Sequence, residues 1–128
     1  MDNQHTFKKA ERLSLKKEID GLFKQGESFI SYPLRIVYLK QKPLLGEKVS
    51  VLISVPKRKI KLAVKRNRLK RLIREAFRLN KSSLIRHCEE KESGLIIAFL
   101  FIGNDLYGWK EIETALQKAL VVLKEKTV

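Results

Sequence analysis

The sequence is short of cysteine, proline and long apolar runs. Its single cysteine, Cys88, excludes an internal disulfide and a zinc site built from several cysteines. The longest apolar run, Leu95–Ile102, is far too short to cross a bilayer, and the N-terminus has no apolar stretch typical of a signal peptide. We therefore expect a cytoplasmic protein in a reducing compartment, with no membrane partner.

Acidic residues are also scarce. The 128 residues include 14 Asp and Glu against 28 Lys and Arg, which gives a net charge of +14. The apolar fraction of 44% is typical of a globular chain, and the length suits a single domain, residues 1–128. Residues 1–12 are polar and basic, and we expect them to form a flexible arm. The excess of cations favours a polyanionic partner, and nucleic acid is the first hypothesis.

The cations gather in one segment. Between Lys57 and Lys81 there are twelve Lys and Arg residues and one acid, Glu75. A solvated helix face is the alternative interpretation of such a run, but solvated faces usually mix charges of both signs. The second half of the segment has a helical period and predicts a helix over roughly 63–79. Its apolar stripe comprises Leu69, Leu72, Ile73, Ala76 and Phe77, all assigned to the core.

No catalytic constellation is visible in the sequence. His5 and His87 lack the spacing of metal ligands, and no glycine-rich phosphate loop precedes a helix. The acidic cluster at 89–92 is interpreted as solvated charge. We therefore predict neither catalytic nor metal-binding residues in this chain.

The apolar patterns predict an α/β (α+β) fold with the element order αββαβα. We expect a two-layer sandwich in which helices cover a small mixed sheet. The first two strands are expected to pair as an antiparallel hairpin, and residues 80–92 to hold one or two extra turns, with Ser82 as a possible cap. The expected elements are a helix at Leu15–Gln25, strands at Ser28–Lys40 and Val49–Val55, the basic helix, a strand buried on both faces at Gly94–Ile102, and a helix at Trp109–Glu125.

Residues 63–78, AVKRNRLKRLIREAFR, carry a more specific signal. They resemble the "RNR" signature of the protein subunit of bacterial ribonuclease P. Residues 54–58, SVPKR, look like the strand ending that precedes this signature in the family. The residues similar to its first-helix pattern are Arg12, Leu13, Ile19, Phe23 and Gly26. The resemblance covers most of the chain.

The resemblance implies a cofactor protein for a catalytic RNA. The holoenzyme hydrolyses a phosphodiester bond in precursor tRNA and releases the 5′ leader, while the RNA subunit carries the active site and binds most of the Mg²⁺. It also implies a left-handed βαβ crossover. A general or ribosome-associated RNA-binding module remains the alternative. A DNA-binding protein is not expected, because no short turn joins the basic helix to a preceding one as in a helix-turn-helix.

The helical period divides the basic helix into two sides. We expect one side to face a groove beside the sheet and, with the resemblance, to hold the leader; the other side and the 57–61 loop are left for the catalytic RNA. Core packing is the alternative for Phe23 and Ile36, and local hydrogen bonding for Asn67. The predicted leader-binding residues are Phe23, Ile36, Tyr38, Arg66, Asn67, Lys70 and Arg74. The predicted catalytic-RNA-binding residues are Lys57, Arg58, Lys59, Lys61, Arg68, Arg71 and Arg78.

Overall fold

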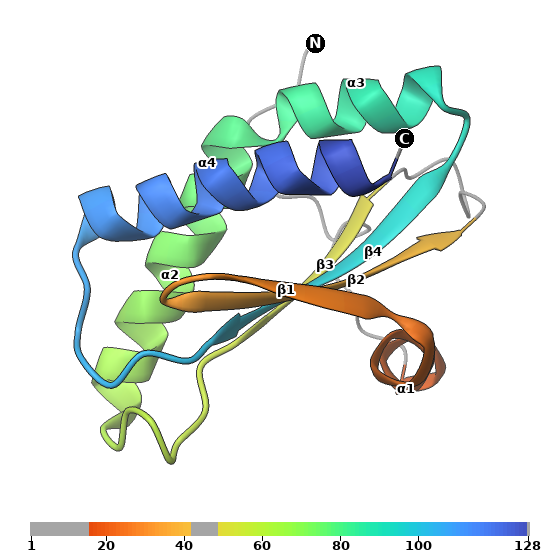
Figure 1. The fold of residues 1–128 in the computed structure, drawn as a ribbon. Helices are drawn as coiled ribbons and strands as arrows, with labels where there is room; N and C mark the ends of the chain where they lie inside the picture. Colours follow the sequence, from red (N-terminus) through yellow and green to blue (C-terminus); the bar gives the residue numbers. More distant parts are fainter. Residues whose placement is uncertain (1–15, 42–48, 128) are drawn as a thin grey trace, which may run out of the picture.

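The computed structural model describes residues 16–41 and 49–127, with side chains for 21–40 and 49–127. The predicted arm at 1–12 and the expected turn at 42–48 lie outside the described residues. The described residues form four strands and four helices (Figure 1). In order they are α1 Lys16–Gln25, β1 Glu27–Ser31, β2 Leu34–Gln41, β3 Val49–Ser54, α2 Ala63–Asn80, α3 Ser82–Glu90, β4 Gly94–Phe101 and α4 Trp109–Lys126.

The strands form one mixed sheet in the order β1-β2-β4-β3. β2 is antiparallel to both β1 and β4, whereas β3 runs parallel to β4. The predicted hairpin between the first two expected strands is therefore wrong, because β4 lies between β2 and β3. The parallel pair β3 and β4 is joined through α2 and α3, which makes a βαβ unit; its left-handed sense stays a prediction.

The expected strand at Ser28–Lys40 is in fact the hairpin of β1 and β2. It turns at Tyr32 and Pro33, which are joined by a cis peptide bond, and Ser31 pairs with Leu34 across the turn. Proline suits this position because it has no N–H to contribute to a strand ladder.

One face of the sheet is covered by α2, α3 and α4 (Figure 1). From β2 this face receives Leu34, Ile36 and Tyr38, and from β3 it receives Val49 and Val51, all of them buried. Both sets have the two-residue period of a strand, so the predicted alternation is confirmed.

The opposite face is covered in part by α1, where Leu22 packs against Val37, Ile96 and Ala98. The helix ends at Gly26, as expected. A Cβ atom built on Gly26 would lie 2.9 Å from the carbonyl oxygen of Tyr38, closer than real Cβ contacts come. The close passage of the chain from α1 into β1 therefore requires glycine.

The expected turn or two after α2 is a complete nine-residue helix, α3. Two of its residues, Leu84 and Cys88, are buried in the main core, so tertiary packing stabilises a segment whose sequence is largely polar. With this helix and the extra strand the order is αβββααβα in place of αββαβα. The mixed α/β class with one small sheet is confirmed.

Candidate nucleic-acid interface

The basic helix α2 is held in place by its apolar stripe. Leu69, Ile73, Ala76 and Phe77 are at most 1% exposed, and the Phe77 ring lies 5.8 Å from that of Phe99 in the central strand. Burial of this stripe fixes the rotation of the helix, so the remaining positions must face away from the core. The assignment of Phe77 to the core is confirmed.

Seven cations of α2 occupy those remaining positions. We call them the α2 cation surface: Lys65, Arg66, Arg68, Lys70, Arg71, Arg74 and Arg78. Lys65, Arg68 and Arg71 are exposed, and the others are half-buried along the flanks. Of these seven cations, only Arg78 has an acidic partner within residues 16–41 and 49–127, and that partner is Glu75. Six cations thus share one helix without a carboxylate to offset their repulsion, which a polyanion would do.

The start of α2 adds to the positive potential. The N-cap residue, Leu62, makes no side-chain hydrogen bond, and the first turn contains no acid. The positive end of the helix dipole therefore lies beside Lys65 without a side-chain cap and without an acid in the first turn of the helix. This arrangement is unfavourable for an isolated helix and favourable for binding phosphate.

Arg66 and Arg78 are already engaged within the protein. The Nη1 of Arg66 donates hydrogen bonds to the carbonyl oxygens of Ile60 at 3.0 Å and Lys61 at 2.7 Å. It therefore ties the loop before α2 to the helix. Arg78 pairs with Glu75 one turn earlier. Arg66 thus has a structural role beside its predicted one, and Glu75 offsets part of the charge that Arg78 would offer to RNA.

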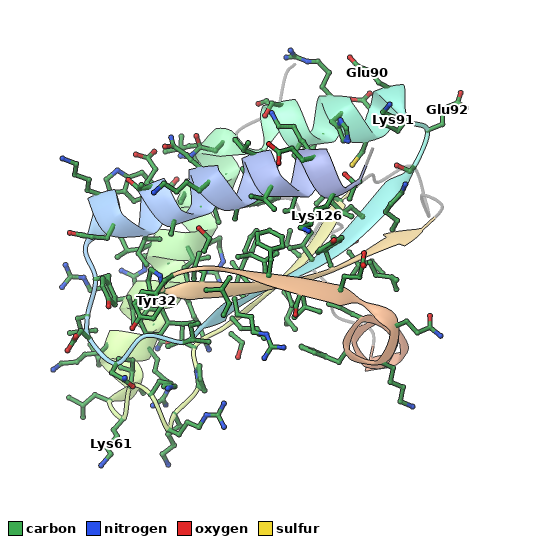
Figure 2. All side chains as sticks on the ribbon, in the orientation of Figure 1. Tyr32, Lys61, Glu90, Lys91, Glu92 and Lys126 are labelled. Atoms are coloured by element: carbon green, nitrogen blue, oxygen red, sulfur yellow. The ribbon has the colours of Figure 1, made fainter. Side chains whose placement is uncertain are left out.

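The loop at 57–61 extends the cationic surface. Ile60 is 6% exposed and anchors the loop, while Lys57, Arg58 and Lys61 are exposed. The Nζ of Lys59 donates to Oδ1 of Asn104 at 3.5 Å, across a hollow of about 370 Å³. Figure 2 shows Lys61 projecting outward beyond the start of α2. Asn67, on the first turns of the helix, is exposed and makes no hydrogen bond within the described part of the chain.

The predicted groove wall of Phe23, Ile36 and Tyr38 is wrong. Ile36 is 0% exposed and Tyr38 is 4% exposed, both in the core beneath the helices. Neither can contact RNA in this conformation. For Ile36 the alternative interpretation, packing in the core, is therefore the correct one. Phe23 is 49% exposed, but it belongs to α1 on the opposite face of the sheet. The three side chains therefore do not share a wall.

Tyr38 also differs from the expectation that its hydroxyl would bring it to the surface. The hydroxyl donates to the Glu27 carboxylate at 3.2 Å, and the ring packs edge-on against Phe29. Burial, together with the nearby Glu27 charge, raises the pKa of Tyr38. The local hydrogen bond satisfies the hydroxyl inside the protein.

The sheet face that carries α1 has an open part that the sequence prediction missed. The strand register places Ile30, Arg35, Leu100 and Ser54 in one row across the four strands on that face. Arg35 is exposed, with a long contact of 3.4 Å from Nη2 to the Ser28 hydroxyl, and Ile30 is 64% exposed. An arginine inside an otherwise apolar strand was the available signal for a face that is not fully covered.

The fold and the α2 cation surface together define a class: a small basic α/β protein that binds RNA. No helix in the described ranges combines the length and apolar character needed to cross a membrane.

Comparisons with known proteins agree. The sequence profile of the Ribonuclease P family matches residues 7–123. The ribonuclease P protein component of Porphyromonas gingivalis (strain ATCC 33277) is 42% identical over 113 residues, which are 88% of this chain and 82% of the relative. That of Chlorobium phaeobacteroides is 38% identical, over 78% of this chain and 74% of the relative. The structure of the ribonuclease P protein from Staphylococcus aureus matches with a TM-score of 0.67 and 25% identity, over 92% of both chains.

The chain therefore belongs to the ribonuclease P protein family, and it is a protein subunit of an endoribonuclease that works with the ribonuclease P RNA.

Proposed function

We propose that this subunit assists an RNA that performs the chemistry. The protein binds the catalytic RNA and the 5′ leader of precursor tRNA, and the RNA subunit hydrolyses the phosphodiester bond that joins leader to tRNA. The observation that carries the proposal is the α2 cation surface, where six of the seven cations have no acidic partner in the described residues. Such a surface offers several phosphate contacts and no nucleophile or general base of its own.

Mg²⁺ enters this proposal as an ion held mainly by the RNA. A chain with a net charge of +14 repels divalent cations, whereas a phosphate backbone concentrates them. Within the described residues, no three His, Cys, Asp or Glu side chains gather closely enough to hold a metal ion. Bound by the RNA near the scissile phosphate, Mg²⁺ would supply Lewis-acid stabilisation of the developing negative charge. The protein then contributes affinity and position, in the cytoplasm where tRNA is matured.

The two RNA partners are assigned to different sides of the protein. We place the leader on the open sheet face, near Phe23 and Arg35, and along the near side of α2. Ser54 on that face lies two residues before Pro56. A single-stranded RNA leader bound on that face can therefore continue directly to the 57–61 loop and the start of α2. Apolar and aromatic groups beside cations suit a single strand. On α2 the leader side comprises Arg66, Asn67, Lys70 and Arg74.

The far side of α2 and the loop before it are assigned to the catalytic RNA. These residues are Lys57, Arg58, Lys59, Lys61, Arg68, Arg71 and Arg78. Of them, Arg78 contributes least, because Glu75 already neutralises it.

Reconstitution tests the proposal. The protein is combined with a ribonuclease P RNA, and removal of a labelled leader from precursor tRNA is measured at low Mg²⁺. We expect the protein to increase leader removal strongly, and to release no leader without the RNA at any Mg²⁺ concentration. Leader removal by the rigorously purified protein alone would contradict the assignment of the chemistry to RNA.

Paired variants test the division between leader and catalytic RNA. Lys70→Ala with Arg74→Ala should weaken holoenzyme binding of precursor tRNA by about 1–3 kcal/mol, because two charge-assisted contacts are lost, and leave mature tRNA binding unchanged. Arg68→Ala with Arg71→Ala should instead weaken assembly with the catalytic RNA. If both pairs lose both affinities in the same proportion, the helix is one undivided cationic surface.

A further inference from the structure

A hollow of about 780 Å³ lies between the edge strand β1 and the helix α4, and it shares only Ile30 with the open sheet face described above. Strand β1 and the turn that follows it form one wall, and one stripe of α4 forms the other. The residues that matter for its chemistry are Ile30, Tyr32, Lys110, Thr114, Lys118 and Val122. We call this hollow the β1–α4 groove.

The groove combines exposed ring and aliphatic surface with two cations. Tyr32 is 57% exposed, and Ile30, at the rim that the groove shares with the open sheet face, is 64% exposed. Lys110 and Lys118 are exposed and have no acidic partner among the described residues. Two turns of helix separate them, a rise of about 12 Å, so their ammonium groups can reach different points of one chain in the groove.

The remaining polar groups of the groove are engaged. The Glu111 carboxylate accepts a hydrogen bond from the N–H of Gly108 at 3.0 Å, where it caps the start of α4. The Ser31 hydroxyl donates to the carbonyl oxygen of Ala115 at 2.7 Å and ties β1 to α4. This bond holds the two walls at a fixed separation, so the groove is built into the fold.

Tyr32 is held in a chain of aromatic rings. Its ring meets that of Tyr107 edge to face at 6.1 Å, and Tyr107 meets Phe101 in the same manner at 6.0 Å. A hydrogen bond with Tyr32 raises the pKa of Tyr107 to about 12. An exposed ring whose orientation is already fixed loses little entropy when a flat ligand stacks on it.

The loop at 102–108 connects the groove to the RNA-binding side of the protein. At one end of the loop Asn104 contacts Lys59 of the cationic loop, and at the other Tyr107 contacts Tyr32. Figure 2 shows Tyr32 near the first turns of α4, on the side of the molecule where Lys61 also projects. An RNA that neutralises the 57–61 loop can therefore continue into the groove without leaving the protein surface.

We infer that the β1–α4 groove binds an unpaired segment of the ribonuclease P RNA, with a base stacked on Tyr32 and phosphates at Lys110 and Lys118. A polyanion is favoured over a second copy of the chain, because two copies of net charge +14 repel each other. The inference rests on the proposed function in that the partner is the catalytic RNA; it adds a contact away from α2.

Charge variants test the phosphate contacts. Lys110→Gln with Lys118→Gln should make the slope of log affinity against log salt shallower by about 1.4–1.8 for assembly with ribonuclease P RNA, since each phosphate contact contributes about 0.7–0.9. The matched control, Lys91→Gln with Lys126→Gln, removes the same charge toward the other end of α4 and should leave the slope unchanged (Figure 2). Equal effects of the two pairs would mean diffuse attraction and overturn the inference.

Aromatic variants test the stacking. Tyr32→Leu should weaken assembly about tenfold, within the range for loss of one stacked base, whereas Tyr32→Phe should retain the affinity. Retention by the phenylalanine variant also separates stacking from the Tyr107 hydrogen bond, which both variants lose. Circular dichroism and thermal melting check folding; if Tyr32→Leu does not fold, the charge pairs and the crosslinking below decide the outcome.

Crosslinking identifies the occupant. The photoreactive residue p-benzoylphenylalanine is placed at Thr114, an exposed residue of α4 that lines the groove, in the full-length protein, and the assembled ribonucleoprotein is irradiated. We expect a protein–RNA adduct at an unpaired RNA segment. A protein dimer, or no RNA adduct from a complex that assembles normally, would overturn the inference while leaving the proposed function intact. Failure of the unaltered protein to bind the RNA would instead contradict the proposed function.

Discussion

The helices α2 and α4 have the same length and share one core, yet the charges on their exposed surfaces are distributed differently. Each is 18 residues long, and each buries a stripe against the same face of the sheet. Helix α4 mixes charges, with Glu111 in its first turn and Lys124 and Lys126 in its last, as the helix dipole favours. Helix α2 contains seven cations and one acid, and no acid in its first turn.

The difference shows which part of each helix serves the fold. The buried stripes are equivalent, so both helices are needed for the core. The exposed residues are not equivalent: α4 mixes acids with its cations, and only its Lys110 and Lys118 are assigned to RNA, whereas the exposed residues of α2 as a set suit a protein bound to a polyanion. Residues that oppose local stability and yet lie on the surface indicate a function for that surface.

The largest expected effect tests the equivalence of the buried stripes. Phe77→Ala in α2 should lower the free energy of unfolding by about 3–5 kcal/mol, and Leu116→Ala in α4 by about 2–5 kcal/mol, because both residues are 0% exposed and leave cavities. Chemical denaturation measures both losses. A loss below about 1 kcal/mol at Phe77 would show that α2 is not part of the core, and would break the comparison.

A smaller effect is expected when the helix starts are altered. Leu62→Asp gives α2 the N-cap and negative charge that it lacks, and should stabilise the free protein by about 0.5–1 kcal/mol. Glu111→Ala removes the corresponding feature of α4 and should destabilise by a similar amount. Thermal melting at equal salt compares the two variants.

The affinity of the Leu62→Asp variant for RNA provides the control for these stability measurements. Leu62→Asp should weaken binding of the ribonuclease P RNA, since a carboxylate then stands where a phosphate is expected. A variant that gains both stability and RNA affinity would contradict the view that the uncapped start of α2 serves RNA.

The smallest expected effect concerns the loop that joins the two regions. The hydrogen bond with Tyr32 raises the pKa of Tyr107 to about 12 from the usual 10.0. The contribution of this pair to stability is therefore complete below pH 10 and is lost as the pH rises toward 12, because the unfolded tyrosine ionises first. The pKa of Tyr38 is also raised, so ultraviolet titration of tyrosinate should show more than one late-titrating tyrosine, and in Tyr32→Phe only Tyr107 should move back toward the usual range. An unchanged titration curve in that variant would contradict the claim that the hydrogen bond with Tyr32 raises the pKa of Tyr107.

The sequence predicted which residues of a strand share a sheet face better than it predicted which strands pair with each other. The period of two placed Leu34, Ile36 and Tyr38 together, and the structure confirms that set. A period does not say which strand lies alongside, so the distant pairing of β2 with β4 was missed. The turn at Tyr32 and Pro33 was missed because it contains no glycine and interrupts an otherwise continuous strand pattern.

The candidate site shows the same limit. The helical period of α2 was enough to separate core residues from cations, and Phe77 was correctly placed. The position of Ile36 and Tyr38 required knowing which sheet face α2 covers, and that follows from the crossover from β3 to β4 rather than from local pattern. An apolar residue of a strand has the same sequence signal on a covered face as on an open one.

The salt dependence of assembly tests the difference between the two helices most directly. Arg68→Gln with Arg71→Gln in α2 is compared with Lys91→Gln with Lys126→Gln, which removes the same charge elsewhere, by measuring affinity for ribonuclease P RNA over a range of salt concentrations. The α2 pair should make the slope of log affinity against log salt shallower by about 1.4–1.8, one phosphate contact for each residue, and the control pair should leave it unchanged. Equal slopes for both pairs would contradict the claim that the cations of α2 form the RNA-binding surface.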